Sequence, residues 1–317
     1  MSSPSLSEIV SRAKAYPDRP SWLRARRATV GGSEIAAIFG VSRFSSSYAL
    51  WQSKKLGVSA ELAGEWLDWG NILEPAIARG WSERSGLDLV DLGRFTIVTH
   101  PNGISSATLD YLIRSPLRGL GVLQIKNASV GVARAFRDGC PLDYELQVRQ
   151  EMLAAGVSWG VLAVLIGGNK LKTFEFSLDL DFEETMLFET REWWDRYVLG
   201  DEVPEIDESE ATLDALKARF PEIVSEEGTI LPLQAATFWK ERERLERELA
   251  TIEAKLVAIE SRFRANLGPF GWGVIPGVGK VSRPSSPRGR WSFPAIAEPD
   301  RAFELERQIR STRSKPS

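Results

Sequence analysis

The chain has 317 residues but only one cysteine and one histidine, and both scarcities limit its possible chemistry. With Cys140 alone it can form no intramolecular disulfide, and a cysteine-only zinc site or a four-cysteine iron–sulfur cluster is excluded. With His100 alone, a multi-histidine metal site and a Ser-His-Asp triad are both nearly excluded. Any catalytic metal must therefore be held mainly by oxygen ligands, which suits Mg²⁺ or Mn²⁺.

Long apolar runs are also missing. The first twenty residues contain no apolar core of signal-peptide length, and no later run is long enough to cross a membrane. Hydrophobic residues make up 43% and charged residues 26%, which is ordinary for a globular protein. We therefore expect a cytoplasmic protein without a membrane partner, in a reducing compartment that agrees with the single cysteine.

Charge is unevenly spread along the chain. The net charge is −3, yet residues 276–317 contain nine Lys or Arg against four Asp or Glu. This basic tail, with Trp291 and Phe293 interspersed, could contact nucleic acid. It could equally be a solvated and loosely ordered end.

Periodicity predicts an α/β domain with a mixed sheet through about residue 200. Pro75 falls inside one expected helix and should kink it or begin a new turn. The expected helices cover residues 31–40, 45–57, 64–86, 143–156 and 181–200. The expected strands are Phe95–Thr99, Ala107–Ile113 and Leu120–Lys126, followed by a hairpin over 159–178 with its turn at Gly167–Asn169.

Residues 201–317 form a second region in this prediction, beginning with the acidic linker 200–210. Beyond it, apolar residues recur every seven positions in a seam that Arg242 interrupts, namely Phe238, Leu245, Ile252 and Ile259 with Leu249, Leu256 and Phe263. We expect either a long surface helix or a helix that pairs in cis with residues 211–220 as a coiled-coil hairpin. A homo-oligomer through this seam is a less favoured alternative. Residues 271–293 indicate a small terminal hairpin.

The stretch "VLQIKNA" at 122–128 places an amide and an ammonium on one face of a strand. Side chains alternate along a strand, so Leu123 and Ile125 share one face while Gln124 and Lys126 share the other. Two interpretations are open: an edge strand with one solvated face, or a strand whose Lys126 points into a functional site.

Two carboxylates upstream pose a similar question. Glu74 shares a helical face with Ile77 and Trp81, and Asp110 stands in the apolar run "SSATLDYLI". A carboxylate in apolar surroundings needs a partner, because burying it alone is costly. Each feature has a structural explanation when it is taken alone; their order along the chain is the stronger signal.

That order resembles the PD-(D/E)XK nucleases, and within them the lambda-exonuclease/YqaJ-type viral recombinase family. The resemblance extends from residue 22 to about residue 153 and rests on five stretches: "WLRARRATVGGSEIAAIFG", "WGNILEPAIA", "SSATLDYLI", "VLQIKNAS" and "YELQVRQEML". It implies a restriction-endonuclease-like core at 1–200, with a central mixed sheet flanked by helices. It also implies a C-terminal extension at 201–317.

The resemblance assigns a metal site. Glu74 and Asp110 would ligate Mg²⁺ or Mn²⁺ through carboxylate oxygens, and the backbone carbonyl of Ile125 would add a ligand. Gln124 stands where the family motif has a carboxylate; an amide oxygen can coordinate the ion, but with one negative charge fewer. An active enzyme is our preferred interpretation, while an engineered Glu→Gln change or a naturally weakened enzyme stays open.

The remaining assignments concern water, phosphate and DNA ends. Lys126 would orient or activate the attacking water and stabilise charge on the phosphate, and Gln147 would assist near that water. Arg26 and Ser33 match the positions that hold the 5′-phosphate of a DNA end, with Ser33 near the start of an expected helix.

The function implied is a phage-type, Mg²⁺-dependent exonuclease that degrades linear duplex DNA from 5′ ends and leaves 3′ single strands for recombination. The resemblance implies a single-strand annealing protein as partner and admits a ring-shaped homo-oligomer in a bacterial host. An endonuclease of the same fold, for example in a defence system, is one alternative. A non-catalytic protein that binds DNA ends is another.

Overall fold

The structure of the chain, a computed structural model, describes residues 4–59, 64–222, 228–276, 278–284 and 291–292. It divides into two compact units, Met1–Val224 and Ser225–Ser317. The boundary lies later than the residue 200 that the sequence indicated, because the helix that follows the acidic linker packs against the first unit.

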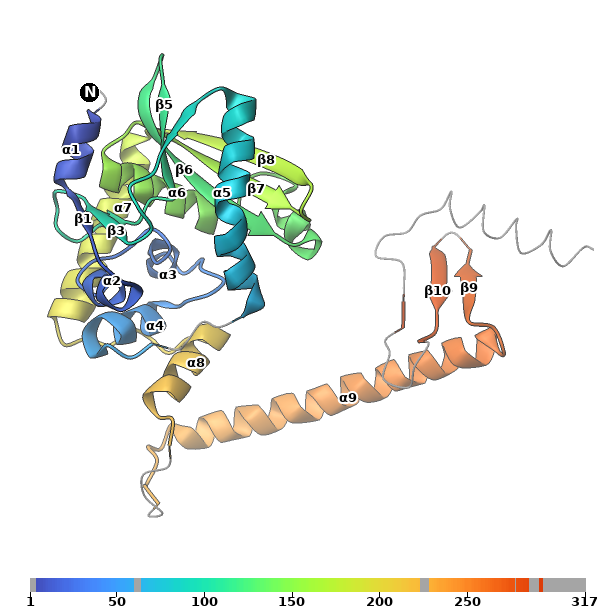
Figure 1. Ribbon diagram of the computed structural model, residues 1–317. Helices are drawn as coiled ribbons and strands as arrows, with labels where there is room; N and C mark the ends of the chain where they lie inside the picture. Colours follow the sequence, from blue (N-terminus) through green and yellow to red (C-terminus); the bar gives the residue numbers. More distant parts are fainter. Residues whose placement is uncertain (1–3, 60–63, 223–227, 277, 285–290, 293–317) are drawn as a thin grey trace, which may run out of the picture. The chain divides into compact units, whose positions relative to one another are not determined.

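A five-stranded mixed sheet forms the centre of the first unit (Figure 1). Its strands, in spatial order, are β2 (Asp88–Val90), β5 (Tyr111–Ser115), β6 (Gly119–Ala128), β7 (Trp159–Ile166) and β8 (Lys170–Ser177). The pair β6 and β7 is parallel, while the other neighbours are antiparallel. The expected α/β class with a central mixed sheet is confirmed. The β7–β8 turn is also as predicted, with Gly167 and Gly168 both at positive φ.

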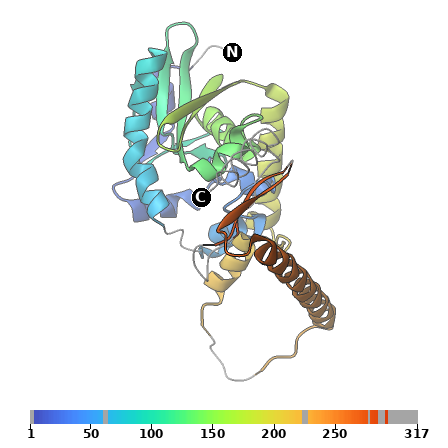
Figure 2. The ribbon, with the colours of Figure 1, turned by 90° about the vertical axis from the view of Figure 1, so that its right-hand side faces the viewer.

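Helices cover both faces of this sheet (Figures 1 and 2). On one face Leu123 and Ile125 pack against α5 (Glu65–Ser85), which runs through Pro75 as one helix. On the other face Val122 packs against α6 (Leu142–Ala155). The alternation of β6 therefore sends Gln124 and Lys126 toward the α6 side.

The N-terminal elements form a second layer beside this core. They comprise α1 (Leu6–Ser11), β1 (Ala13–Ala15), α2 (Arg19–Arg26), α3 (Ile35–Ile38), α4 (Ser47–Trp51) and the π-helix η1 (Gln52–Leu56). The strands β3 (Thr96–Thr99) and β4 (Ser106–Ala107) join β1 in a three-stranded sheet. The 3-10 helix η2 (Val130–Phe136) follows β6.

The last helices of the first unit are α7 (Leu180–Trp193), the π-helix η3 (Trp194–Leu199) and α8 (Glu210–Arg219). Ala215 of α8 is buried in an apolar cluster with Trp51 and Trp193, and the buried Gln52 amide donates to the Ala215 carbonyl at 2.7 Å. Sequence patterning offered α8 as a partner of the long helix that follows it, or that long helix as a surface helix. In the structure α8 packs against α4 instead.

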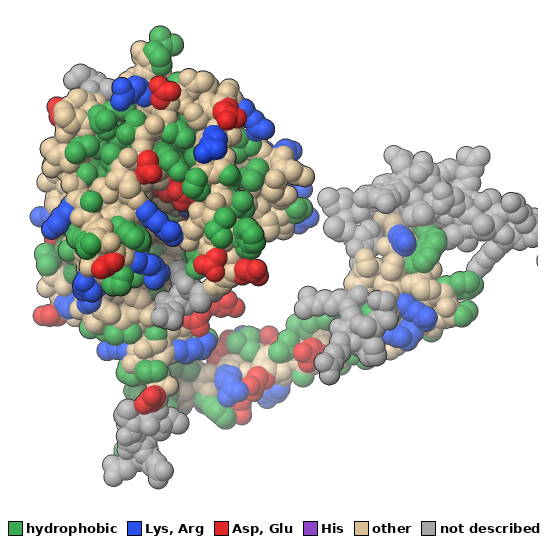
Figure 3. All heavy atoms as spheres, in the orientation of Figure 1, with side chains coloured by type: hydrophobic (Ala, Val, Ile, Leu, Met, Phe, Trp, Pro, Cys, Tyr) green, Lys and Arg blue, Asp and Glu red, His purple; other side chains and the backbone are tan. Residues whose placement is uncertain are grey.

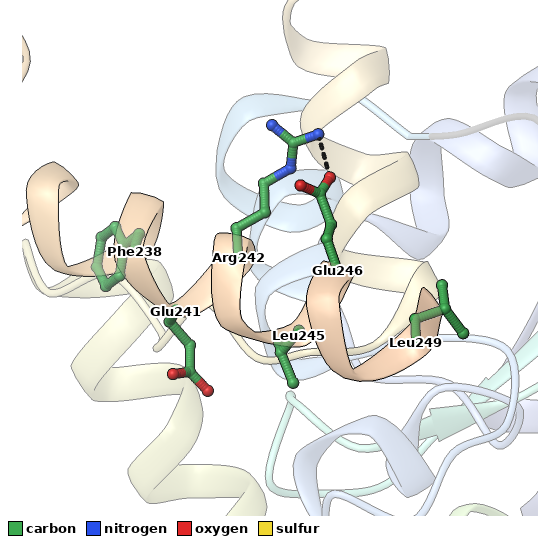
Figure 4. Close-up of a pocket in the computed structure, with 6 residues that line it drawn as sticks. All are labelled: Phe238, Glu241, Arg242, Leu245, Glu246 and Leu249. Carbon is green, nitrogen blue, oxygen red and sulfur yellow. Dashed lines mark ion pairs between the residues drawn. The ribbon is translucent and has the colours of Figure 1, made fainter. Parts of the chain in front are cut away.

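The second unit is built on α9 (Ala235–Leu267), a helix of 33 residues without a buried side chain among those described. Its apolar seam is exposed, and Figure 4 shows Phe238, Leu245 and Leu249 along it, with Arg242 paired to Glu246 at 2.7 Å.

The predicted terminal hairpin is present as β9 (Trp272–Ile275) and β10 (Gly279–Ser282). Most of the basic tail lies outside the described residues. No helix in the described part of the chain is both long and apolar enough to span a bilayer.

Candidate active site

The polar pair on β6 lies at the centre of the sheet. β6 sits between β5 and β7, and Gln124 is only 3% exposed, so the interpretation as a solvated edge strand is wrong. Lys126 is half-buried, with its Nζ 5.9 Å from the centroid of the Tyr144 ring. The α6 face of β6 thus changes from apolar at Val122 to polar at Gln124 and Lys126.

Asp110 reaches this polar region from a break between two strands. The sequence predicted one strand over Ala107–Ile113, but the structure ends β4 at Ala107 and begins β5 at Tyr111, in a different sheet. Because Asp110 lies in this break, its carboxylate can reach β6. Its Oδ2 accepts from the backbone N–H of Ile125 at 2.8 Å and from Nε2 of Gln124 at 2.5 Å.

Helix α6 contributes two further polar side chains. Nε2 of Gln147 donates to Oε1 of Gln124 at 2.9 Å and to Oε1 of Glu151 at 3.1 Å. Sequence reasoning identified Gln147 but missed Glu151, which is completely buried. A signal was available, because residues four apart on a helix share a face and Glu151 follows Gln147 by four.

The carboxylates of this region have raised pKa values, chiefly because they are buried. Burial raises the pKa of Asp110 to about 6, although Lys126 and the Ile125 N–H pull it down. Burial and the nearby Asp110 raise the pKa of Glu74 to about 7, against the opposing charges of Arg94 and Lys126. Burial and Asp110 also raise the pKa of Glu151. Negative charge is therefore concentrated where water is scarce, and a cation would relieve it.

The donor atoms fit a hard divalent cation. Oδ2 of Asp110 and the carbonyl oxygen of Ile125 both contact the same nitrogen, Nε2 of Gln124, at 2.5 and 3.1 Å. Two oxygens thus converge on one point, now occupied by an amide N–H. A cation in its place would have both oxygens as ligands, and the Gln124 amide oxygen, which accepts from Gln147, has a second lone pair to offer.

Carboxylates alone would not complete such a site. Within the described residues, no three His, Cys, Asp or Glu side chains lie close enough together to hold a metal ion by themselves. Oxygens from Gln124 and the Ile125 carbonyl would therefore have to join those of Asp110 and Glu74. Such an all-oxygen set is the kind that Mg²⁺ and Mn²⁺ prefer.

The residues expected to hold a terminal phosphate also come together. Nη2 of Arg26 donates to Oγ of Ser33 at 3.0 Å and lies 3.3 Å from a carboxylate oxygen of Glu34, while its guanidinium stands over the Trp22 ring. The nearly inaccessible Lys54 pairs with the same carboxylate at 2.7 Å. Burial raises the pKa of Glu34, but Lys54 and Arg26 outweigh it and hold the pKa below its ordinary value.

Two cations thus face one carboxylate, which leaves positive charge for an anion. The helix argument for Ser33 is weaker than the sequence indicated, because α3 has only four residues. Phosphate binding here would depend on the Arg26 guanidinium and the Ser33 hydroxyl.

The loop that leads to Ser33 lies against the centre on α6. Nε2 of the buried Gln150 donates to the Val30 carbonyl at 3.0 Å. A Cβ at Gly32 would stand 3.4 Å from Glu151 and 3.5 Å from Gln147, so the loop contacts both side chains. Figure 3 shows acidic side chains in a recess of the first unit, with Lys and Arg side chains beside it. The residues expected to bind a phosphate and the carboxylate cluster therefore border one region.

Comparison with known proteins identifies the class to which this arrangement belongs. Residues 21–158 match the family model of the YqaJ-like viral recombinase domain, so the resemblance is confirmed over this part of the chain. All the site residues named above lie within this range.

Individual relatives are more distant. The uncharacterized protein YqaJ of Bacillus subtilis (strain 168) is 26% identical over 268 residues, which covers 81% of each chain. The alkaline exonuclease LHK-Exo from Laribacter hongkongensis is 15% identical, with a TM-score of 0.45 over 56% of this chain and 92% of that one. A phage-related exonuclease from Haemophilus somnus 129PT is 13% identical, with a TM-score of 0.39 over 55% and 96%.

Proposed function

We propose that this protein is a metal-dependent nuclease that hydrolyses DNA phosphodiester bonds. The observation that supports this most directly is that Asp110, the Ile125 carbonyl and Gln147 all contact the buried amide of Gln124 on β6. The family match supports the same class of activity.

Each side chain has a role in this proposal. Asp110 and Glu74, with oxygens from Gln124 and Ile125, would hold Mg²⁺ or Mn²⁺. The ion would supply a water of lowered pKa and neutralise charge on the phosphate. Lys126, on the same face of β6 as Gln124, would orient the attacking water and stabilise the developing charge on the phosphate oxygens.

Gln147 would keep the metal-site amide in place, because it already donates to Gln124. It would also assist near the attacking water that Lys126 would orient. Loss of Gln147 would therefore disturb both the ligand and the water.

The finer proposal is a 5′-to-3′ exonuclease on linear duplex DNA. Arg26 and Ser33 form a contact point for a terminal 5′-phosphate, and the loop before Ser33 rests on Gln147 and Glu151. An enzyme that holds the terminal phosphate beside its reactive centre would remove nucleotides from that end. The 3′ single strands produced would suit a single-strand annealing protein as partner, in the cytoplasm of a bacterial host. A ring of several copies would keep the enzyme on its substrate.

The decisive experiment incubates the purified protein with end-labelled linear duplex and with closed-circular duplex, each with Mg²⁺ and with EDTA. Progressive loss of label from 5′-phosphorylated linear DNA, only with Mg²⁺, is the expected result. Cleavage of closed circles would instead indicate the endonuclease. Binding of ends without any cleavage in Mg²⁺ or Mn²⁺ would indicate a non-catalytic end-binding protein.

A further inference from the structure

Glu151 is a buried carboxylate beside the centre to which no motif assigned a role. It lies on α6 one turn after Gln147, and its Oε1 accepts from Gln147 Nε2. Its Oε2 is buried and, among the residues the structure describes, has no hydrogen-bond partner. An unpartnered carboxylate oxygen in such a place is costly to the fold, so a stabilising role alone does not account for it.

The same region lacks a negative charge at position 124. The nuclease motif has a carboxylate where this chain has Gln124, and only one side chain separates that amide from Glu151. Gln147 donates to Oε1 of both residues, at 2.9 and 3.1 Å. Groups that bind the ligands of a metal commonly set ligand orientation and adjust the charge around the ion.

We propose that Glu151 is a positioning residue of the metal centre, which fixes Gln124 through Gln147 and supplies the negative charge that position 124 lacks. This role rests on the metal-dependent function proposed above. Direct ligation of the ion by Glu151 is not part of this role.

Packing around Glu151 keeps its carboxyl group in the centre. A Cβ on Gly32 would lie 3.4 Å from both Cγ and Oε1 of Glu151, so the loop closes over the carboxylate. The side chain is completely buried and cannot reach bulk water in this conformation. A charge held there in low dielectric acts on a nearby cation more strongly than an exposed one would.

Glu151→Gln tests the charge with little change of shape, because the new amide oxygen can still accept from Gln147. Mn²⁺ binding to the full chain, measured by isothermal titration calorimetry without DNA, gives a readout independent of cleavage. We expect E151Q to bind Mn²⁺ roughly 10- to 100-fold more weakly than wild type. The double variant Gln124→Glu/Glu151→Gln, which returns the charge to β6, should recover near wild-type affinity.

Glu183→Gln is the matched control. Glu183 on α7 is also a buried glutamate with an unpartnered oxygen, and burial raises its pKa to about 7, but its charged neighbours are Arg149 and Asp179 rather than the centre. We expect E183Q to bind Mn²⁺ as wild type does. An equal loss in E183Q and E151Q would overturn the positioning role and indicate a general effect of altering buried carboxylates.

The remaining outcomes separate this role from the proposed function. If the wild-type protein neither binds Mn²⁺ nor cleaves DNA, the proposed function itself is refuted. A wild type that binds while E151Q binds equally well overturns only the role of Glu151, as does a loss that Gln124→Glu fails to restore. If circular dichroism finds E151Q unfolded, Glu151→Asp decides: it keeps the charge but draws it back from Gln147, so unchanged Mn²⁺ affinity would refute the role and weaker binding would support it.

Discussion

Replacing Asp110 by Asn should stabilise the metal-free protein at alkaline pH while removing its response to metal. Asp110 carries a pKa of about 6 in the folded chain against an ordinary value of 3.8. The folded state therefore holds this proton more tightly than the unfolded state does. Wild-type stability should fall as pH rises from about 4 to about 6 and should then level off.

The size of the effect follows from the two pKa values. A factor of ten in proton affinity is worth about 1.4 kcal/mol, so the rise to about 6 corresponds to about 3 kcal/mol. Glu74 adds in the same direction up to about pH 7, but solvent screens part of its share. An Asn at position 110 cannot titrate, and its oxygen can still accept from the Ile125 N–H. Between pH 4 and pH 8, the free energy of unfolding should therefore fall by about 3 kcal/mol less in D110N than in wild type.

The measurement is urea unfolding followed by circular dichroism in EDTA at both pH values, repeated with Mg²⁺ at pH 8. Wild type should gain stability from Mg²⁺, and D110N should not. Asp214→Asn, at an exposed ion pair on α8, is the control and should change the pH dependence by less than about 0.5 kcal/mol. Equal pH dependence in D110N and wild type would refute the assignment of Asp110 to a crowded carboxylate site.

Three further predictions follow from the site. Lys126→Ala should abolish cleavage and leave DNA binding nearly unchanged in a gel-shift assay; an equal loss of both would make the lysine an ordinary phosphate contact. Wild type should prefer 5′-phosphorylated over 5′-hydroxyl ends, and Arg26→Ala should erase a preference worth roughly 1.5–3 kcal/mol, as measured by degradation rates on the two substrates. Gln124→Glu should lower the Mg²⁺ concentration for half-maximal activity, and an unmoved titration in an active enzyme would argue against a metal-site role for this residue.

Local sequence patterns were sufficient to predict much of the architecture. The alternation in 122–128, the glycine turn after β7 and the seven-residue spacing in α9 each depend on a repeat within one element, so the printed sequence predicted them correctly. The scarcity of cysteine and histidine limited a metal site to oxygen ligands before any contact was known.

Elements that depend on distant partners were less predictable. The run Ala107–Ile113 has the composition of one strand, but its two ends join different sheets and Asp110 occupies the break. Residues 210–219 read as a helix that could pair with the long helix after it, and in the structure this helix packs against α4 and accepts from the Gln52 amide. A local pattern says that a face must be buried without saying against which partner.

The sequence by itself determined the order of the site residues, the class of metal that could be held, and the face of β6 on which Gln124 and Lys126 lie. Tertiary structure alone decided that β6 is central, that Asp110 and Gln147 both contact Gln124, and that Glu151 is buried beside them. The physical reason is that side-chain alternation is set within a few residues, whereas the interaction of a carboxylate with other groups depends on the distances between them in the folded chain. Those distances exist only after segments that lie far apart along the chain have packed together.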